Sequence, residues 1–465
     1  MRKVFKELKG LAGLRKIHFV GIGGAGMSPL ARILAERGYD VSGSDRGDSE
    51  IIAKLRELGA KIYLGGQRAE NVRGADAIVV STAIAFDNPE VLAARDLGIK
   101  KLHRSDINAA LVNEYKGIAV AGSHGKTTTT SMLGVTLHHA GISPTIIVGG
   151  EVPDLGTNAV LGKGEYLVSE ADESDGSFLK LHPTIAVVTN VEDDHMDHYG
   201  TMENIVKAFT QFIENTADRG GYAVLCFENE NLRHIAQKTT RKVYSYGIEH
   251  PADYNAKHIV THEAGIRFDV FHGEEKLGHI ELNIPGRHNV LDAMACIVTE
   301  LTIGIPFEKI AEGLAAFHGA KRRFQTIARK GGVWIVDDYG HHPTEIAATL
   351  KAARQTNPHR LVCVFQPHRY SRTQLLHEEF GKAFTAADKL VLTDIYSAGE
   401  APIPGISGET ILKEVEKQTG QDVAYIRDRE KIAGYLKDKL EPGDLVITMG
   451  AGDIYKTSRE LAALL

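Results

Sequence analysis

The chain has 465 residues, which is too long for one compact core and predicts about three domains. Its 43% hydrophobic and 25% charged residues are typical of a globular protein and exclude wholesale disorder or a fibrous repeat. The 54 Lys and Arg against 60 Asp and Glu give a net charge of −6, which offers no support for nucleic acid or a membrane surface as a partner.

The basic N-terminal segment holds no apolar stretch of signal-peptide length, and no later run reaches the roughly 18 to 20 apolar residues of a membrane span. The three cysteines, Cys226, Cys296 and Cys363, lie far apart in segments that we interpret as strand or helix interior. We therefore expect reduced core thiols in a cytoplasmic protein without membrane insertion.

Short apolar runs recur along the chain, and amphipathic stretches follow them. They include KIHFV at 16–20, ADAIVVST at 75–82, GIAVAG at 117–122, TIAVVTNV at 184–191, VWIVDDY at 333–339 and DLVITMGAG at 444–452. Because most of these runs lack alternation, they favour parallel strands covered on both faces and an α/β fold. The alternating segments 265–271 and 276–284 predict an antiparallel hairpin appended to the middle of the chain.

Two breaks in this series predict three α/β domains. The first break lies near residues 100–116, where a run of strand and helix units ends before a new strand. The second lies near residues 318–330, in a basic stretch flanked by glycine. We expect domains at residues 1–107, 108–319 and 320–465.

The first glycine-rich turn, GIGGAG at 21–26, directly follows the predicted strand 16–20. A G-x-G-x-x-G turn permits close approach of a diphosphate to a helix N-terminus, and Asp45 ends the next strand at a spacing that suits a ribose hydroxyl. NAD and a UDP-sugar present the same diphosphate to the backbone, so the motif leaves both open, beside a tight turn without a ligand.

The second turn, GSHGKTT at 122–128, follows the predicted strand 117–122 and precedes a predicted helix. Its backbone N–H groups would cradle phosphate oxygens, Lys126 would meet the β- and γ-phosphates, and the Thr127 hydroxyl could bind Mg²⁺. Val120 stands where the strict phosphate-loop spacing has glycine, so this is a shortened variant. A lysine capping an ordinary turn is the alternative, but it leaves the four threonines at 127–130 unexplained.

Two acidic clusters follow later strands of the same predicted sheet, EADESD at 170–175 and EDDHMDH at 192–198. Open α/β sheets bind ligands at the carboxyl ends of their strands, and Mg²⁺ prefers hard oxygen ligands. Thr127 with one of these carboxylates therefore predicts a magnesium site. Solvated acidic turns are the alternative, and the HMDH spacing alone does not predict zinc.

Nine segments, among them GIGGAGMSPLA, VAGSHGKTTTT, EADESDGSF, TNVEDDHMDHYG, GRHNVLDAMA, KRRFQ, DDYGHHPTE and FQPHRYSRT, resemble the Mur ligases of peptidoglycan synthesis, in order and along nearly the whole chain. The resemblance implies an N-terminal Rossmann-like domain that holds a UDP-sugar and a central P-loop ATPase-like domain with a mixed sheet. It also implies a C-terminal Rossmann-like domain that closes over ATP and binds an amino acid.

The resemblance implies ATP and two Mg²⁺ ions as cofactors, with Mn²⁺ as an alternative, and catalytic roles for Lys126, His195 and Arg323. The implied metal ligands are Thr127, Glu170 and His195. The implied ATP-binding residues are Gly122, Ser123, His124, Gly125, Lys126, Thr127, Thr128, Asn289, Arg323 and Asp338, with Asp337 as the alternative at the ribose. The implied UDP-sugar-binding residues are Gly23, Gly24, Ala25, Gly26, Met27, Asp45, Ser81, Thr82, Gly149, Thr157 and Asn158.

The amino-acid site implied by the resemblance lies in the last domain, at Tyr339, His341, Arg369 and Arg372. Two guanidinium groups three positions apart would suit the carboxylate of the incoming amino acid. For the segment around His341 the alternative is a turn capped by Pro343.

The implied activity is a cytoplasmic step of cell wall synthesis that serves cell shape and division. ATP would convert the lactyl carboxylate of UDP-N-acetylmuramate into an acyl phosphate, which the amine of L-alanine then captures. The partners would be these small molecules, with a monomer or homodimer as the assembly. A sister ligase that adds a recycled peptide or another amino acid is one alternative. An NAD-dependent oxidoreductase is the other, and it leaves the Lys126 loop without a role.

Overall fold

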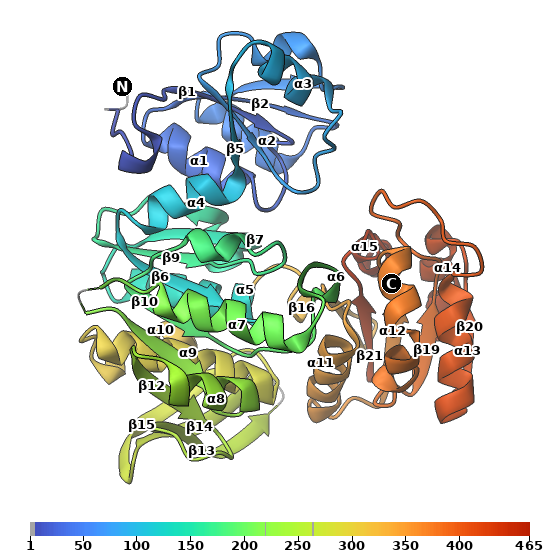
Figure 1. Ribbon diagram of the computed structural model, residues 1–465. Helices are drawn as coiled ribbons and strands as arrows, with labels where there is room; N and C mark the ends of the chain where they lie inside the picture. Colours follow the sequence, from blue (N-terminus) through green and yellow to red (C-terminus); the bar gives the residue numbers. More distant parts are fainter. Residues whose placement is uncertain (1–4, 219, 263–264) are drawn as a thin grey trace. The chain divides into compact units, whose positions relative to one another are not determined.

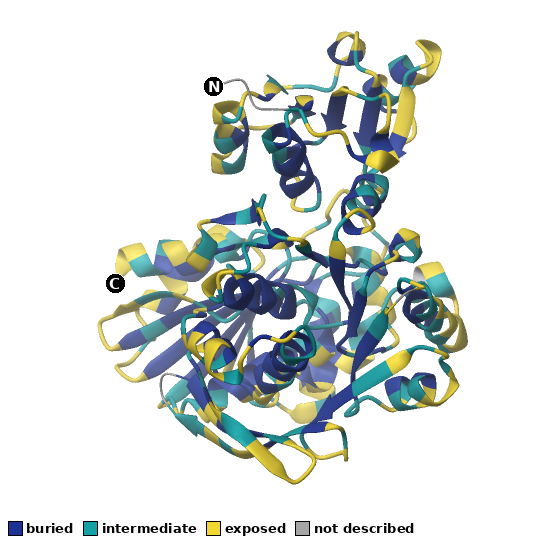
Figure 2. Ribbon diagram, turned by 90° about the vertical axis from the view of Figure 1, so that its left-hand side faces the viewer, coloured by how far each residue is buried: buried dark blue, intermediate teal, exposed yellow. Residues whose placement is uncertain are grey.

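The computed structural model describes residues 5–218, 220–262 and 265–465, which form three sheets flanked by helices (Figure 1). The chain separates into two units, one built mainly from residues up to Lys257 and from Leu291 to Phe317, and one mainly from His318 to Leu465. Figure 2 shows buried residues concentrated along the strands and on the sheet-facing sides of the helices. Short 3-10 helices occupy Lys9–Leu11, Ala69–Val72, Pro153–Leu155, Ser177–Lys180 and Arg429–Lys431.

The first sheet is parallel throughout, in the order β3-β2-β1-β4-β5. The order reverses between β1 and β4, which in open α/β sheets marks the ligand-binding edge. Ile17, Phe19 and Val20 of β1 are fully buried, as the unbroken apolar run predicts. The strands are β1 Lys16–Val20, β2 Asp40–Asp45, β3 Lys61–Leu64, β4 Ala77–Val80 and β5 Lys100–His103. The helices are α1 Ser28–Glu36, α2 Glu50–Glu57, α3 Pro89–Asp96 and α4 Arg104–Val112.

The second sheet is mixed, in the order β15-β14-β13-β12-β11-β10-β6-β9-β7-β8. Across the sheet, the neighbours β12, β11, β10, β6, β9 and β7 pair in parallel, while β8 at the edge runs antiparallel to β7. The strands are β6 Lys116–Ala121, β7 Thr145–Val152, β8 Thr157–Val160, β9 Tyr166–Glu170, β10 Ile185–Val188, β11 Tyr222–Cys226, β12 Lys242–Gly247 and β13 Tyr254–His262. The helices are α5 Lys126–His139, α6 Met196–Tyr199, α7 Met202–Glu214, α8 Glu230–Lys238, α9 Arg287–Thr302 and α10 Phe307–Ala315.

The expected hairpin is present as β14 (Gly265–His272) and β15 (Glu275–Leu282), and a two-residue connection joins the strands. Ile266, Phe268 and Val270 are buried, while the intervening residues are partly or fully exposed, which explains the alternating sequence. The hairpin extends the edge of the ten-stranded sheet.

The third sheet has the order β16-β17-β21-β18-β19-β20, with β16 antiparallel and the others parallel. Leu361, Cys363 and Phe365 of β18 pack into one hydrophobic cluster, and Val362 and Val364 pack into another, so the sheet is covered on both faces. The strands are β16 Gln325–Lys330, β17 Val333–Asp338, β18 Arg360–Phe365, β19 Lys389–Leu392, β20 Val423–Tyr425 and β21 Asp444–Met449. The helices are α11 Pro343–Gln355, α12 Tyr370–Ala383, α13 Gly408–Thr419, α14 Ile432–Lys437 and α15 Tyr455–Leu464.

The α/β class and the buried parallel strands predicted from the apolar runs are confirmed. The three cysteines are buried free thiols, as expected. Within the described ranges, none of the helices combines the length and the apolar character that a membrane crossing requires. The domain boundaries stay predictions, and the first of them falls inside α4.

Candidate active site

The phosphate loop joins β6 to α5 through two glycines with left-handed backbone, Gly122 at φ 139° and Gly125 at φ 86°. A Cβ atom at Gly122 would lie 2.1 Å from Thr189 Oγ1, and one at Gly125 would lie 2.5 Å from Asp292 Oδ1. Both positions therefore require glycine for conformation and for space. Helix α5 begins at Lys126 immediately after the loop, which directs its first N–H groups toward the turn.

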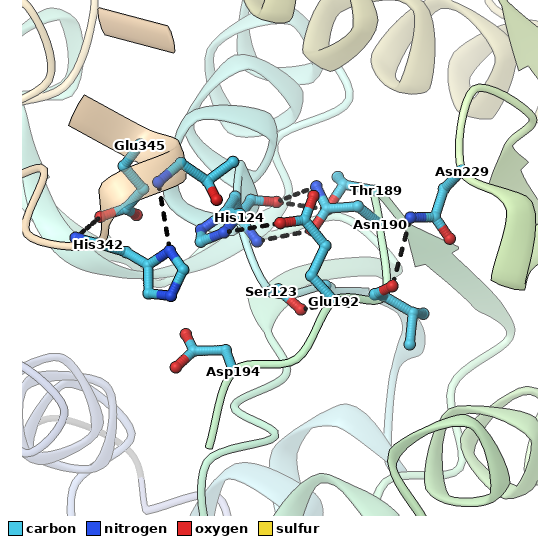
Figure 3. Close-up of polar contacts among 12 residues, drawn as sticks. Ser123, His124, Thr189, Asn190, Glu192, Asp194, Asn229, His342 and Glu345 are labelled. Atoms are coloured by element: carbon cyan, nitrogen blue, oxygen red, sulfur yellow. Dashed lines mark hydrogen bonds and ion pairs between the residues drawn. The ribbon is translucent and has the colours of Figure 1, made fainter. Parts of the chain in front are cut away.

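The residues after β10 hold this loop in place (Figure 3). The side chain of Asn190 accepts a hydrogen bond from His124 N at 2.8 Å and donates one to His124 O at 3.0 Å. Thr189 Oγ1 donates to the same carbonyl at 2.5 Å, and Ser123 N donates to Asn190 O at 3.2 Å. The loop is therefore fixed by a neighbouring parallel strand as well as by its own turn.

The Lys126 side chain lies among carboxylates. Its Nζ donates to Glu173 Oε1 at 2.7 Å and to two loop carbonyls, Gly122 O at 2.5 Å and Ser123 O at 3.2 Å. Burial works to lower the pKa of Lys126, but Glu173, Asp172 and Glu170 outweigh it, and the pKa is raised. The site therefore keeps a full positive charge beside the loop.

Two further ionisable side chains, His195 and Asp172, act on the site of this lysine. His195 Nε2 lies 3.6 Å from Glu173 Oε1 and 3.5 Å from Asp194 Oδ2. Burial works to lower the pKa of His195, but these carboxylates raise it above the ordinary histidine value. Asp172 forms an ion pair with Arg104, and the charges of Arg104 and Lys126 hold the pKa of Asp172 well below its usual range despite burial.

The predicted metal ligands come from three places around the loop. Thr127 is in the first turn of α5, Glu170 ends β9, and His195 precedes α6 with left-handed backbone at φ 58°. Glu170 Oε1 accepts a hydrogen bond from Gly149 N at 2.7 Å. In the described part of the chain, no three His, Cys, Asp or Glu side chains gather into a group that could hold a metal ion by themselves. A hydroxyl with one or two carboxylates nevertheless fits Mg²⁺, which usually keeps water and substrate phosphates as its other ligands.

The N-terminal glycine-rich turn has a simpler construction. Gly21 has left-handed backbone at φ 76°, and Gly23 N donates to Asp45 Oδ2 at 2.8 Å. Asp45 thus closes the turn against β2, and its role at a ribose stays a prediction. A Cβ atom at Gly26 would lie 2.9 Å from Arg104 Nη1, so a cation lies beside the turn.

The other predicted UDP-sugar residues lie in the turn before α1, after β4, and in β7 and β8. Met27 is the N-cap of α1, and Ser28 Oγ accepts a hydrogen bond from Asn158 Nδ2 at 3.0 Å. Arg32 Nη1 donates to Thr157 Oγ1 at 3.0 Å. These contacts bring β8 to the helix that follows the turn. Gly24 and Ala25 lie in the turn itself, Ser81 and Thr82 follow β4, and Gly149 lies in β7.

The predicted amino-acid residues cluster in the C-terminal unit. His341 Nδ1 lies 3.1 Å from Tyr339 O, and the rings of His341 and His368 are 5.9 Å apart. Arg372 Nη1 lies 3.4 Å from His368 Nδ1, and Arg369, at φ 71°, precedes α12. Burial lowers the pKa of His341 to about 4 and that of His368 to about 3. Both imidazoles are therefore neutral at neutral pH.

Both aspartates considered for the ATP ribose are buried and engaged within the protein. Asp337 binds Arg322 Nε at 3.0 Å and Thr448 Oγ1 at 2.7 Å. Asp338 accepts hydrogen bonds from Phe324 N at 2.8 Å and Gly340 N at 2.7 Å. Burial raises the pKa of each carboxyl.

The remaining predicted residues of the C-terminal unit have identified neighbours. The Arg323 guanidinium lies 5.4 Å from the centre of the Tyr339 ring and 3.8 Å from Glu345. Asn289 Nδ2 donates to Pro285 O at 2.6 Å. His342 caps α11, whose first residue is Pro343.

Sequence reasoning did not assign roles to several residues that shape these sites. Four of them lie in segments that resemble the family: Thr189 and Asn190 in TNVEDDHMDHYG, Asp292 in GRHNVLDAMA and His368 in FQPHRYSRT. The motifs did not show which of these residues contact one another, because the partners lie far apart in the sequence. The unassigned residues are Arg104, Thr189, Asn190, Asp292, His368 and Tyr396.

Three family models match the chain in succession. They are described as Mur ligase family, catalytic domain, at residues 16–116, Mur ligase middle domain at 120–299, and Mur ligase, glutamate ligase domain, at 322–452.

Curated relatives match over nearly the full length. A UDP-N-acetylmuramate--L-alanine ligase of Desulforamulus reducens is 50% identical over 96% of this chain and 97% of its own. A protein of the same name from Trichlorobacter lovleyi is 49% identical over 96% of this chain and 98% of its own.

Solved structures agree with these relatives. UDP-N-acetylmuramate-alanine ligase MurC from Thermotoga maritima superposes with a TM-score of 0.83 at 29% identity, covering 96% of this chain and 98% of that chain. A murein peptide ligase from Psychrobacter arcticus superposes with a TM-score of 0.74 at 24% identity, which shows a shared fold.

Proposed function

The chain belongs to the Mur ligase family, and we propose that it uses ATP to join L-alanine to the lactyl carboxylate of UDP-N-acetylmuramate. The observation that carries the proposal is the phosphate loop, with Lys126 partly buried and held positive beside two glycines that leave no room for a side chain. The choice of L-alanine and of the sugar nucleotide rests on the relatives, which are about 50% identical over nearly the whole chain.

A carboxylate does not form an amide directly, because oxide is a very poor leaving group, so it must first be activated. The lactyl carboxylate attacks the γ-phosphorus of ATP, which forms an acyl phosphate and releases ADP. The amine of L-alanine, having lost a proton, then attacks the acyl carbon, and inorganic phosphate leaves. Both steps accumulate negative charge on phosphate oxygens, so positioning and fixed positive charges supply most of the catalysis.

Lys126 and Arg323 are the proposed fixed charges, and the backbone N–H groups of residues 122–128 would hold the nucleotide phosphates. When Mg²⁺ is bound, it neutralises phosphate charge; Thr127 and Glu170 are its proposed ligands, with His195 at a second ion. We further propose that Asn289 and Asp338 contact the adenosine.

The N-terminal turn at 21–26 is the proposed diphosphate site of the sugar nucleotide. Asp45, Ser81 and Thr82 on one side, and Gly149, Thr157 and Asn158 on the other, would complete it. This assignment is supported by the hydrogen bonds that join Thr157 and Asn158 to α1. Arg104 beside Gly26 adds a positive charge that suits a diphosphate.

The cluster of Tyr339, His341, Arg369 and Arg372 is the proposed site for the amino acid. Its neutral imidazoles leave the positive charge on the guanidinium groups, which suits a carboxylate. The domain ranges 1–107, 108–319 and 320–465, the cytoplasmic location and a monomer or homodimer are parts of the same proposal.

The two alternatives receive less support. An oxidoreductase has no use for the Lys126 loop, and the relatives are ligases. A ligase for a recycled peptide shares the fold, but the relatives near 50% identity carry the name of the alanine enzyme.

Phosphate release measured with ATP, Mg²⁺, UDP-N-acetylmuramate and each amino acid in turn tests the proposal. We expect release to require both the sugar nucleotide and L-alanine, and ¹⁸O placed in the lactyl carboxylate to appear in the released phosphate. Release that needs a peptide in place of L-alanine, or phosphate without the label, would contradict it.

A further inference from the structure

Lys126 uses its whole hydrogen-bonding capacity within the protein. An ammonium group has three donors, and Nζ directs them at Gly122 O, Ser123 O and Glu173 Oε1. A phosphate oxygen that binds this ammonium must therefore replace one of these three acceptors.

Two of the acceptors are difficult to move. Gly122 O and Ser123 O belong to the loop backbone. The residues after β10 hold this backbone through Ser123 N and through the N–H and C=O of His124. Gly122 also packs so closely against Thr189 that a Cβ atom would not fit, which leaves its backbone little room to move. The loop carbonyls would thus move only with the whole turn.

The third acceptor, Glu173, is anchored by its backbone, whereas the oxygen that meets Lys126 belongs to its side chain. Its carbonyl accepts hydrogen bonds from Tyr199 Oη at 2.6 Å and from Gly176 N at 3.0 Å. Its carboxylate is reached through three rotatable bonds, so it can leave Lys126 without any change in the chain path.

The carboxylate of Glu173 also has a second polar side chain, that of His195, within reach. Oε1 lies 3.6 Å from His195 Nε2, while Oε2 is buried without a hydrogen-bond partner in the described chain. The side chain is 3% exposed, so water compensates little for the loss of a partner. A carboxylate displaced from Lys126 would therefore turn fully toward His195.

We propose that Glu173 is a positioning residue that competes with the nucleotide phosphates for Lys126 and passes to His195 when they bind. The inference rests on the proposed ATP site and deepens it, because it assigns the group that the phosphates displace. The inference predicts that removing the Glu173 charge strengthens nucleotide binding. A merely structural role of Glu173 would not produce a change in this direction.

Titration calorimetry with adenylyl imidodiphosphate in EDTA tests this competition without metal or turnover. Glu173→Gln keeps the shape and removes the charge, and we expect Kd to fall roughly tenfold, the size of one competing charge-assisted hydrogen bond. Asp172→Asn is the matched control. It removes a charge that also acts on Lys126, but its direct partner is Arg104, so we expect Kd to fall less than about threefold.

Glu173→Asp provides a second variant that keeps the charge but shortens the reach to Nζ, and we expect an intermediate gain in affinity. If Glu173→Gln does not fold, the Kd of Glu173→Asp tests the inference in its place. Equal or weaker binding by the folded Glu173 variants, or an equal gain in Asp172→Asn, would overturn the inference. Absence of nucleotide binding by the unmodified protein both in EDTA and in excess Mg²⁺ would instead contradict the proposed function.

Discussion

The phosphate-loop region and the C-terminal histidine cluster handle charge in opposite ways. Around the loop, cations and carboxylates are paired at close range, as Lys126 is with Glu173 and Arg104 with Asp172. In the C-terminal cluster, burial keeps His341 and His368 uncharged. The first region holds a positive charge ready for exchange between anions. The second confines positive charge to guanidinium groups and keeps its imidazoles as neutral neighbours.

The largest effect should come from removing the exchangeable charge. Lys126→Ala should lower kcat on the order of 10²- to 10³-fold, because one preorganised charge next to the phosphates is lost. Steady-state phosphate release with both co-substrates checks this. If kcat stays near normal while the protein remains folded, the loop is not the site of phosphoryl transfer and the contrast between the regions loses its meaning.

Removal of a guanidinium from the second region should affect one substrate. Arg372→Ala should raise KM for L-alanine about 10- to 100-fold and leave KM for ATP within about threefold, because a charge-assisted contact to the amino acid is lost. Arg427→Ala removes an exposed arginine of the same unit and should change neither KM. An equal rise in both KM values for Arg372→Ala would argue against a dedicated amino-acid site.

The hydrogen bonds by which Asn190 holds the phosphate loop, here called the clamp, can be removed without changing the charge of the loop. Asn190→Ala removes both side-chain hydrogen bonds to the backbone N–H and C=O of His124, and KM for ATP should rise about threefold to tenfold. Asn231→Ala is the matched control, because Asn231 binds Val191 O in the same segment but not the loop. Identical KM values for the two variants would show that the clamp does not position the loop.

The neutral imidazoles predict a loss of stability in mild acid. The folded pKa of His341 is about 4, below its ordinary value near 6.5, so its contribution is complete above pH 6.5 and is lost as the pH falls toward 4. Linkage gives about 2 kcal/mol at pH 5 for this group. Urea titrations followed by Trp334, the single tryptophan and a residue of β17, report on the C-terminal unit.

His341→Gln should reduce the stability difference between pH 7 and pH 5 by that amount. His359→Gln, at a largely exposed histidine of the same unit, should leave the difference unchanged. If both variants keep the pH dependence of the unmodified chain, then His341 does not enter the folded state uncharged.

Local sequence predicted those features that depend on consecutive residues. The apolar run of β6, the glycines at 122 and 125 and the lysine that starts α5 lie within a dozen positions, so the loop and its helix were predictable. Short or partly exposed strands such as β3 and β20 carried no comparable signal and were missed. Turn chemistry and burial both leave a local pattern, whereas a short edge strand does not.

The partners of the site residues could not be predicted in the same way. Glu173 lies 47 positions from Lys126, and Asn190 lies 66 positions from His124. Such pairs are set by the order of strands in the sheet, which places the ends of β6, β9 and β10 side by side. A single sequence gives the order of segments along the chain but not their order across the sheet.

The backbone at Arg369, the residue before α12, carries a conformational cost. At φ 71° and ψ 140° it occupies a region suited to glycine, and such strain costs roughly 1 to 3 kcal/mol for other residues. Glycine at this position would make an easier chain to fold but would remove a guanidinium from the proposed amino-acid site. An engineer who ranks substitutions by thermostability would thus be led to discard this arginine first, a trade of catalytic fitness for robustness.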